Sequence, residues 1–98
     1  MINRIVRLSF EPVKVNDFLE VFENSKQLIA SFPGCEGLKL LRDANHPNVF
    51  YTYSLWQQPE NLEQYRTSEL FKNTWAQTKV LFNDKPMAWS TEVVEHVK

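Results

Sequence analysis

Residues 31–37 read Ser-Phe-Pro-Gly-Cys-Glu-Gly and separate a helical pattern from a strand pattern. Pro33 cannot continue a helix because its nitrogen carries no hydrogen to donate, and Gly34 can adopt the left-handed conformation that follows many helix ends. Gly34 and Gly37 are the only glycines in the chain. Glycine therefore occurs only at this turn, and the stretch predicts a helix, a tight turn and a strand in the first half of the chain.

The segment before this turn predicts a strand followed by a helix. Residues 2–10 alternate in character, with Val6, Leu8 and Phe10 sharing one face, and a period of two is typical of a strand. Asn16 is a favoured residue for capping the start of a helix, and apolar residues then recur at steps of three and four until the turn. We therefore expect a helix that Asn16 caps and that presents one apolar stripe to the core.

The rest of the chain predicts two helices placed between strands. Strands are expected at 38–42 and at 49–56, the second of them rich in β-branched and aromatic residues. A short helix should begin at Pro59, a residue suited to the first helical position, and a longer helix after Ser68. A last strand is expected at 87–97. The order β-α-β-β-α-β, with the second helix in two pieces, is that of a ferredoxin-like α+β sandwich.

The composition indicates one globular domain over residues 1–98. Hydrophobic residues make up 43% of the chain, enough for a packed core, and the net charge of −1 includes no basic stripe for nucleic acid. No apolar stretch approaches the roughly 20 residues that span a membrane. Arg4 and Arg7 interrupt the opening apolar run, so we expect no secretory signal, a cytoplasmic location and a whole protein that begins at Met1.

The strands also predict a second buried surface. In 49–56 and 87–97 both alternating faces carry apolar residues, as Phe50 and Tyr51 on successive positions illustrate. In this arrangement the helices cover one face of the sheet, which leaves the other face to be covered or polar. A chain of this size has nothing left to cover that face. We therefore expect a homodimer, packed sheet to sheet through the helix-free face.

Several quoted stretches carry a resemblance to a known family. The turn at 32–37 reads Phe-Pro-Gly-Cys-Glu-Gly, a strand ends in Trp56, and residues 57–71 read Gln-Gln-Pro-Glu-Asn-Leu-Glu-Gln-Tyr-Arg-Thr-Ser-Glu-Leu-Phe. With the order of elements, these features resemble the antibiotic biosynthesis monooxygenase (ABM) superfamily of dimeric α+β barrels over essentially the whole chain. Such families include cofactor-independent monooxygenases of aromatic quinols and polyketides, haem-degrading monooxygenases and many members of no known activity. The resemblance thus implies the fold and leaves the activity open.

The chain departs from the haem-degrading branch of this superfamily. Those enzymes use an asparagine on the first strand, a tryptophan that closes the short helix and a proximal histidine early in the last helix. The matching positions here hold Val6, Tyr65 and Trp75. Without the histidine there is no axial nitrogen for iron, so we expect no haem-degrading activity.

The sequence contains no signature of a cofactor or metal site, and we expect neither. Cys35, His46 and His96 lack metal-ligand spacing, and no Cys-x-x-Cys or Glu-x-x-His occurs. Two glycines cannot build a phosphate-binding loop, although a flavin supplied by another protein is left open. We expect Cys35 to be structural, His46 to be an exposed turn residue and His96 to be an exposed strand residue. The alternative for His96 is that the last strand carries it to the pocket of a partner subunit.

Aromatic residues at the end of the short helix and in the last helix are candidates for a ligand pocket. An aromatic cleft between helices and sheet suits a small aromatic molecule, and two polar side chains could orient a phenol or quinone. The candidate substrate-binding residues are Tyr65, Trp75, Phe71, Phe22, Val6, Arg4 and Tyr53. The alternative is ordinary core packing, since aromatic stripes at helical spacing commonly fill a core.

Two functions follow from the residues and the resemblance together. The first is a cofactor-independent monooxygenase (an oxidoreductase) of a small aromatic or quinol-like substrate, which would itself donate an electron to O₂ once deprotonated. Tyr65, Trp75 and Arg4 would supply a dry pocket and a hydrogen bond to the phenolate. The second is a non-catalytic ligand-binding or structural homodimer on the same fold, which the lack of any base–nucleophile pair favours. An isomerase or dehydratase would need a buried histidine or carboxylate, and the sequence assigns no catalytic residue.

Overall fold

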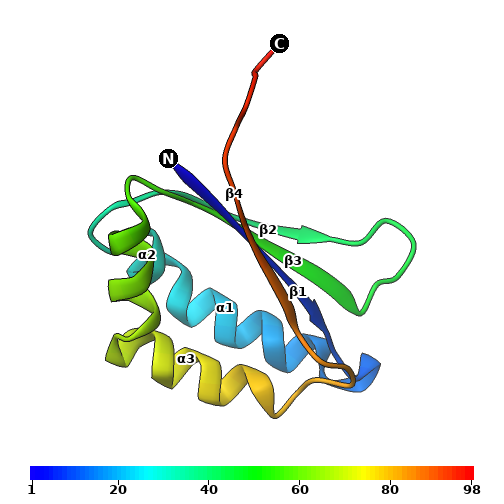
Figure 1. Cartoon of the computed structure of the whole chain (residues 1–98). Helices are drawn as coiled ribbons and strands as arrows, with labels where there is room; N and C mark the ends of the chain where they lie inside the picture. Colours follow the sequence, from blue (N-terminus) through cyan, green and yellow to red (C-terminus); the bar gives the residue numbers. More distant parts are fainter.

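The computed structural model describes residues 1–98 as a four-stranded antiparallel sheet with helices on one face (Figure 1). The elements, in chain order, are β1 (Ile2–Ser9), a 3-10 turn (Pro12–Lys14), α1 (Val15–Ala30), β2 (Cys35–Arg42), β3 (Val49–Trp56), α2 (Pro59–Arg66), α3 (Glu69–Lys79) and β4 (Met87–Thr91). The strand order across the sheet is β2-β3-β1-β4. The ferredoxin-like α+β class expected from the sequence is confirmed, with the second helix in two pieces.

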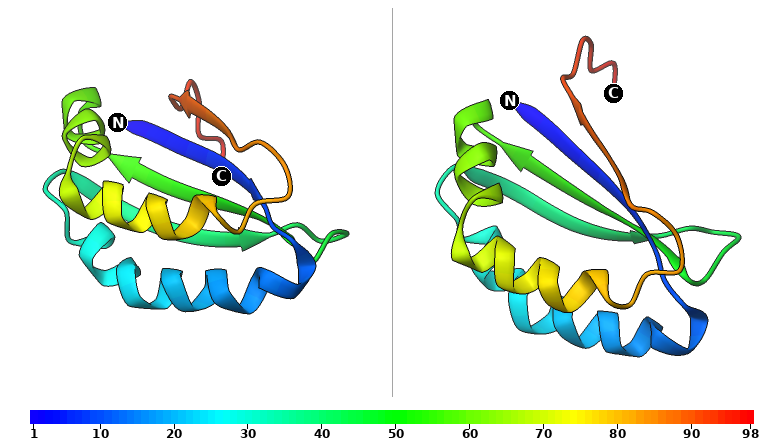
Figure 2. Two further views of the ribbon diagram at one scale, coloured as in Figure 1. Left: turned by 90° about the horizontal axis from the view of Figure 1, so that it is seen from below. Right: turned by 60° about the horizontal axis from the view of Figure 1, so that its bottom comes forward.

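The helices form one layer and the sheet forms the other (Figure 2). α1 and α3 run side by side along the sheet, and α2 stands at one end of it, directly after β3. The segment after β4 leaves the sheet on the side away from the helices (Figure 1). None of the helices combines the length and the apolar character that crossing a lipid bilayer requires. The cytoplasmic location expected from the sequence stays a prediction.

The pairing of β1 decides which side chains face the helices. β1 pairs antiparallel with β3 and with β4, so that Ile5 lies opposite Tyr53 on one side and opposite Trp89 on the other. Because side chains alternate along a strand, these three share the helix-free face, whereas Arg4 and Val6 point toward the helices. The alternation expected for residues 2–10 is therefore confirmed.

Stacked aromatic rings form the core at one end of the sheet. Phe10, just after β1, is fully buried and stacks on Phe18 of α1 with 4.2 Å between ring centroids. On its other side it stacks on Phe82, which follows α3, at 5.3 Å. Leu8 and Phe50 complete the buried cluster. Burial of each such side chain contributes about 1.5–3 kcal/mol, so this cluster ties β1, α1 and the end of α3 together.

The turn after α1 packs directly against the start of α2. Gly34 has a φ of 86°, and a Cβ at this position would lie 2.2 Å from Asn61 Cγ. Asn61 in turn caps α2, because its side chain accepts the backbone N–H of Gln58 at 3.1 Å. The carbonyl of Gly34 accepts the N–H of Gln57 at 2.9 Å. The missing side chain at position 34 therefore allows the turn and the helix start to touch.

The start of α1 differs from the expectation that Asn16 caps it. α1 begins at Val15, and no side chain caps its first turn. The 3-10 turn that begins at Pro12 carries the backbone directly into the helix, since Val15 already donates its N–H to the carbonyl of Pro12. Asn16 is thus inside the helix, and the prediction that it caps the helix was wrong.

Two strand boundaries also differ. β2 begins at Cys35 rather than at 38, because an irregularity between Cys35 and Gly37 lets the strand continue its pairing to the end of β3. β4 ends at Thr91 rather than at 97. Thr91 pairs with Asn3 in the last pair between β1 and β4, and the residues after Thr91 form no further strand pairing, so the longer strand expected from the sequence does not form.

Gly34→Ala should lower the free energy of unfolding by about 2 kcal/mol or more, because alanine resists a positive φ and its Cβ would collide with Asn61. Gly37→Ala is the matched control, since a Cβ there would meet only Leu55 Cβ, at 3.8 Å, and should change stability by less than about 1 kcal/mol. Urea unfolding of both variants measures the two effects. Equal losses in the two variants would show that the turn is not specially constrained.

Candidate functional site

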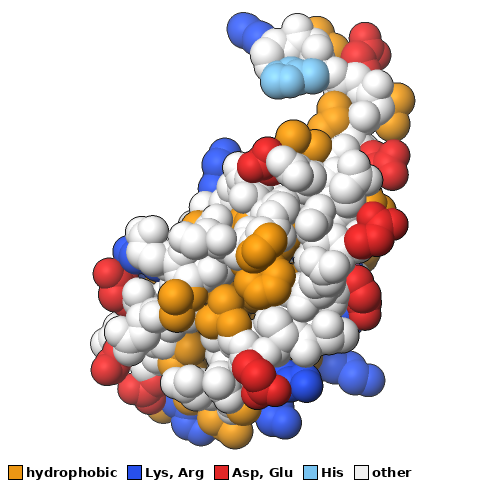
Figure 3. Space-filling model, turned by 90° about the vertical axis from the view of Figure 1, so that its left-hand side faces the viewer, with side chains coloured by type: hydrophobic (Ala, Val, Ile, Leu, Met, Phe, Trp, Pro, Cys, Tyr) orange, Lys and Arg blue, Asp and Glu red, His pale blue; other side chains and the backbone are white.

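A cavity of about 340 Å³ lies between the sheet and the helices. The helix-facing side chains of β1 and β3 form its floor, α1 and α3 form its walls, and α2 closes one end. Pro86 and the first two residues of β4 line the remaining side. Figure 3 shows the molecule from the side of α2, where hydrophobic side chains gather across the middle and charged ones lie mostly around them.

Six of the seven candidate pocket residues line this cavity. They come from four different elements: two from β1, one from α1, one from α2 and two from α3. These residues are Arg4, Val6, Phe22, Tyr65, Phe71 and Trp75. The topology expected from the sequence brings them together, because β1 runs along the floor beneath both α1 and α3.

Tyr65, Phe71 and Trp75 form a continuous aromatic wall. The rings of Tyr65 and Phe71 meet edge to face at 5.3 Å, and those of Phe71 and Trp75 stack at 5.8 Å. Tyr65 also stacks on the fully buried Trp56 at 5.1 Å. Each such pair contributes about 0.5–1.5 kcal/mol beyond the burial of apolar area. The buried Trp56 therefore stabilises the wall from the core side, and the contacts among its three rings stabilise it along its length.

Ser68 fixes the junction between α2 and α3 that carries this wall. Its hydroxyl accepts the backbone N–H of Phe71 at 3.1 Å, as expected for the residue that caps a helix. The same hydroxyl donates to the carbonyl of Tyr65 at 2.6 Å. One side chain therefore sets the positions of the residues on both sides of the junction.

Tyr65 keeps its proton at neutral pH. Burial, and to a lesser degree the neighbouring Cys35, raises the pKa of Tyr65 to about 12. No protein group hydrogen-bonds to its hydroxyl, while the ring lines the cavity. The group can donate a hydrogen bond to a ligand and is unsuited to act as a base near pH 7.

The other hydroxyls around the cavity are mostly engaged within the protein. Ser25 and Thr78 donate to carbonyls of their own helices at 2.9 and 2.8 Å. Ser54 accepts the indole N–H of Trp56 at 2.9 Å. The cavity is therefore mainly apolar, with few groups free to orient a ligand.

Arg4 and Arg66 are the only charged residues that line the cavity. Arg4 Nη1 donates to Ser90 Oγ at 3.1 Å, and Arg66 Nη1 lies 3.5 Å from Glu63 Oε2. Burial and then the charge of Arg66 lower the pKa of Arg4, with Glu63 opposing them. No carboxylate or imidazole is among the lining residues. The site has positive charge and lacks a side chain that could accept a proton.

Tyr53 lies outside the cavity, which corrects its assignment as a pocket residue. It faces the helix-free side of the sheet, where its hydroxyl donates to Asn3 Oδ1 at 2.6 Å and Lys39 Nζ lies 5.9 Å from its ring centroid. The alternation along β3 places its neighbours Thr52 and Ser54 at the cavity instead. The alternation of side chains along this strand could be predicted from the sequence, but the sequence did not show which of its two faces the helices cover.

Sequence reasoning missed Arg66 and the first two residues of β4. Arg66 is the last residue of α2, where a basic side chain is ordinary because it complements the helix dipole, so nothing singled it out. Met87 and Ala88 reach the cavity because β4 pairs with β1 at the edge of the sheet. That contact depends on long-range pairing, which local patterns do not reveal.

The remaining singled-out residues lie away from the cavity. The side chain of His46 is 68% exposed, with Nδ1 3.1 Å from Asp43 Oδ1, as expected for a turn histidine. His96 follows the end of β4 and contacts the carbonyl of Lys98, so it is exposed but not in a strand. Burial raises the pKa of the Cys35 thiol, whose Sγ lies 3.5 Å from the Gly37 carbonyl. The chain brings no three potential metal-ligating side chains together.

Comparison with known proteins identifies one matching family. The sequence pattern of the family "antibiotic biosynthesis monooxygenase" matches residues 1–77. No curated protein matches the chain.

Solved structures share the fold at low sequence identity. One described as an antibiotic biosynthesis monooxygenase has a TM-score of 0.90 and 16% identity, covering 97% of this chain and 100% of the other. A conserved protein from Methanosarcina mazei Go1 has a TM-score of 0.88 and 16% identity, covering 92% and 89%. Rv0793 from Mycobacterium tuberculosis has a TM-score of 0.88 and 14% identity, covering 99% and 98%. At this identity the likeness concerns the fold alone.

In the Tyr65→Phe variant, the free energy of unfolding should fall less between pH 10 and 12 than it does in the parent protein. Between pH 10 and 12 the folded protein holds the Tyr65 proton while an unfolded chain releases it, so the free energy of unfolding falls as the pH rises. A pKa of about 12 against an ordinary value near 10 makes this component about 2 kcal/mol at pH 12. Urea unfolding of the parent protein and of Tyr65→Phe across this pH range isolates the contribution of Tyr65, because all other groups titrate in both proteins. Parallel curves would contradict a buried phenol.

Proposed function

This chain belongs to the antibiotic biosynthesis monooxygenase family, and we propose that it is a cofactor-independent monooxygenase of a small aromatic, quinol-like substrate. The observation that carries the proposal is the 340 Å³ aromatic cavity between the helices and the sheet. Its volume is in the range of small-molecule sites, and its lining is apolar with a few convergent polar groups. Tyr65, Phe71 and Trp75 would contact the ring faces and edges of the substrate.

The proposed reaction needs no external reductant. A quinol with an unsubstituted ring carbon takes one oxygen atom of O₂ at that carbon and leaves as a hydroxyquinone, while the second oxygen atom leaves as water with two hydrogens of the substrate. The substrate supplies all four electrons that reduce O₂. The protein must therefore favour the deprotonated substrate and exclude bulk water, rather than hold an oxidant.

Arg4 and Tyr65 fit the two polar roles in this reaction. The positive charge of Arg4 would stabilise a phenolate and so lower the pKa of the bound substrate. The protonated Tyr65 hydroxyl would donate a hydrogen bond to the same or a second oxygen. With no carboxylate or imidazole at the cavity, the substrate proton would pass to solvent.

A second candidate function is ligand binding without catalysis. The observation that favours it is the absence of any proton-accepting side chain among the lining residues. Oxygen uptake separates the two functions, because both predict binding and only the first predicts consumption of O₂.

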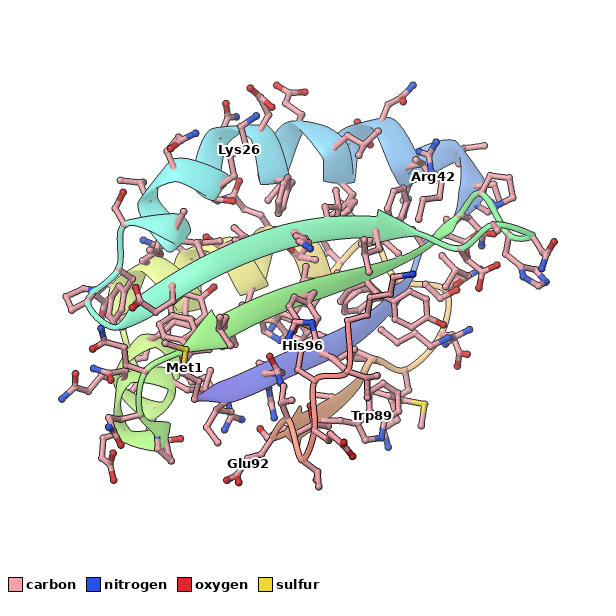
Figure 4. The ribbon with its side chains drawn as sticks, turned by 90° about the horizontal axis from the view of Figure 1, so that it is seen from above. Met1, Lys26, Arg42, Trp89, Glu92 and His96 are labelled. Atoms are coloured by element: carbon pink, nitrogen blue, oxygen red, sulfur yellow. The ribbon has the colours of Figure 1, made fainter.

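We further propose that the chain forms a homodimer through the helix-free face of the sheet. This face carries Ile5, Leu41, Tyr51, Tyr53, Leu55, Met87 and Trp89, together with Arg7 and Lys39. Figure 4 looks onto this face and shows Trp89 near the β4 edge. Leu41, Met87 and Trp89 are each among the exposed large hydrophobic residues, and a second copy of the same face would cover them.

Trp75→Leu should reduce kcat/KM for oxygen uptake with a naphthoquinol by about tenfold or more, because it removes an aromatic wall of the cavity. Val80→Ala, at an exposed position directly after α3 that does not line the cavity, is the control and should keep most of the activity. An oxygen electrode measures both rates against the spontaneous oxidation of the quinol. Binding of the quinol without any protein-dependent oxygen uptake would favour the non-catalytic function.

Leu41→Arg should convert the dimer to a monomer of 11.6 kDa, because it places a charge in the proposed sheet-to-sheet interface. Leu28→Arg is the control, since Leu28 lies on α1 and is 60% exposed against 47% for Leu41. Sedimentation equilibrium gives the mass of each protein. A dimer that survives Leu41→Arg but not Leu28→Arg would place the interface on the helices.

A further inference from the structure

We propose that the cavity binds its aromatic ligand as an organic anion, with a carboxylate held between Arg4 and Arg66 at the α2 end. The inference rests on the proposed function in one respect, which is that the cavity is the ligand site. It adds that the ligand is amphipathic, with an apolar ring system at one end and a fixed negative charge at the other.

The placement of the two arginines supports a single anion site. Arg4 reaches the cavity from the floor, on β1, and Arg66 reaches it from the end wall, as the last residue of α2. The positive charge of Arg66 contributes to the lowered pKa of Arg4. Every other lining residue is uncharged, so the cavity has one polar, cationic end and one apolar end.

The charge of Arg4 is poorly compensated within the protein. The Arg4 residue is partly buried, its one hydrogen-bond partner is the neutral Ser90 hydroxyl, and none of the ion pairs in the protein includes Arg4. Arg66 has a single contact of 3.5 Å with Glu63, and both of these side chains are exposed. Arg4 is partly desolvated, has spare donors and feels the positive charge of Arg66, and a bound anion would offset the cost of this arrangement.

A carboxylate suits this pair better than other groups. A guanidinium presents parallel N–H donors that match the two oxygens of a carboxylate, and two such groups can share one anion. An ammonium group would be repelled, and a neutral hydroxyl would leave most donors unpaired. The ring system would then extend away from the arginines, between Phe22 and the wall formed by Phe71 and Trp75.

The test compares two probes of the same shape that differ in charge. By isothermal titration calorimetry at pH 7, the protein should bind 2-naphthoate at least tenfold more tightly than 2-naphthalenemethanol. Arg4→Gln and Arg66→Gln should each weaken naphthoate binding by about 10- to 100-fold and change binding of the alcohol by less than about threefold. Arg42→Gln is the matched control, because Arg42 is an exposed arginine of β2 that neither lines the cavity nor lies on the helix-free face, and it should leave both affinities unchanged.

Three results would overturn the inference. They are equal binding of the two probes to the parent protein, no naphthoate binding at millimolar concentration, and an equal loss for both probes in Arg4→Gln and Arg66→Gln. Because Arg66 is exposed, its variant reports on binding even if Arg4→Gln folds poorly. Charge-selective binding without oxygen uptake would sink the monooxygenase proposal and leave this one standing, whereas oxygen uptake without charge selectivity would do the reverse.

Discussion

The contact between the turn at Gly34 and the side chain of Asn61 is the constraint on which the site depends. Asn61 caps the helix that ends in Tyr65 and Arg66, so its position sets the end wall of the cavity. The turn that meets it is fixed by α1 on one side and by β2 on the other. A glycine with positive φ thus links the two halves of the fold, and any side chain there would push α2 away from the cavity.

Alternate residues of the same strands form two different surfaces of the sheet, the floor of the cavity and the helix-free face. On one face, Arg4 and Val6 line the cavity, and on the other, Ile5 lies between Tyr53 and Trp89. Along β1 and β3 the period of two keeps the two surfaces separate, whereas Met87, at the start of β4, both lines the cavity and belongs to the helix-free face. This division explains why the strands looked apolar on both faces in the sequence, and why the helix-free face remains partly apolar and exposed in the single chain.

Local patterns predicted the order of elements, and therefore most of the cavity. Strand alternation and helical stripes place Val6, Phe22 and Trp75 toward a common interior. The packing of the helices on the sheet then brings these residues together around the cavity. The pattern failed for Tyr53 because alternation defines two faces without saying which one the helices cover. It failed again at the end of β4, where strand propensity continues but pairing with β1 stops at Thr91. In each case the decisive information was tertiary, as it was for Arg66, whose position at a helix end looked ordinary.

Binding of a ligand in the cavity should also raise the melting temperature of the protein. A compound that binds only the folded chain raises the free energy of unfolding by about 2.7 kcal/mol at a concentration one hundred times its Kd. For a domain of 98 residues, this corresponds to a rise in melting temperature of roughly 10–20 °C. Melting curves recorded across a library of aromatic compounds would therefore rank natural and unnatural ligands alike, with no knowledge of the chemistry that follows binding.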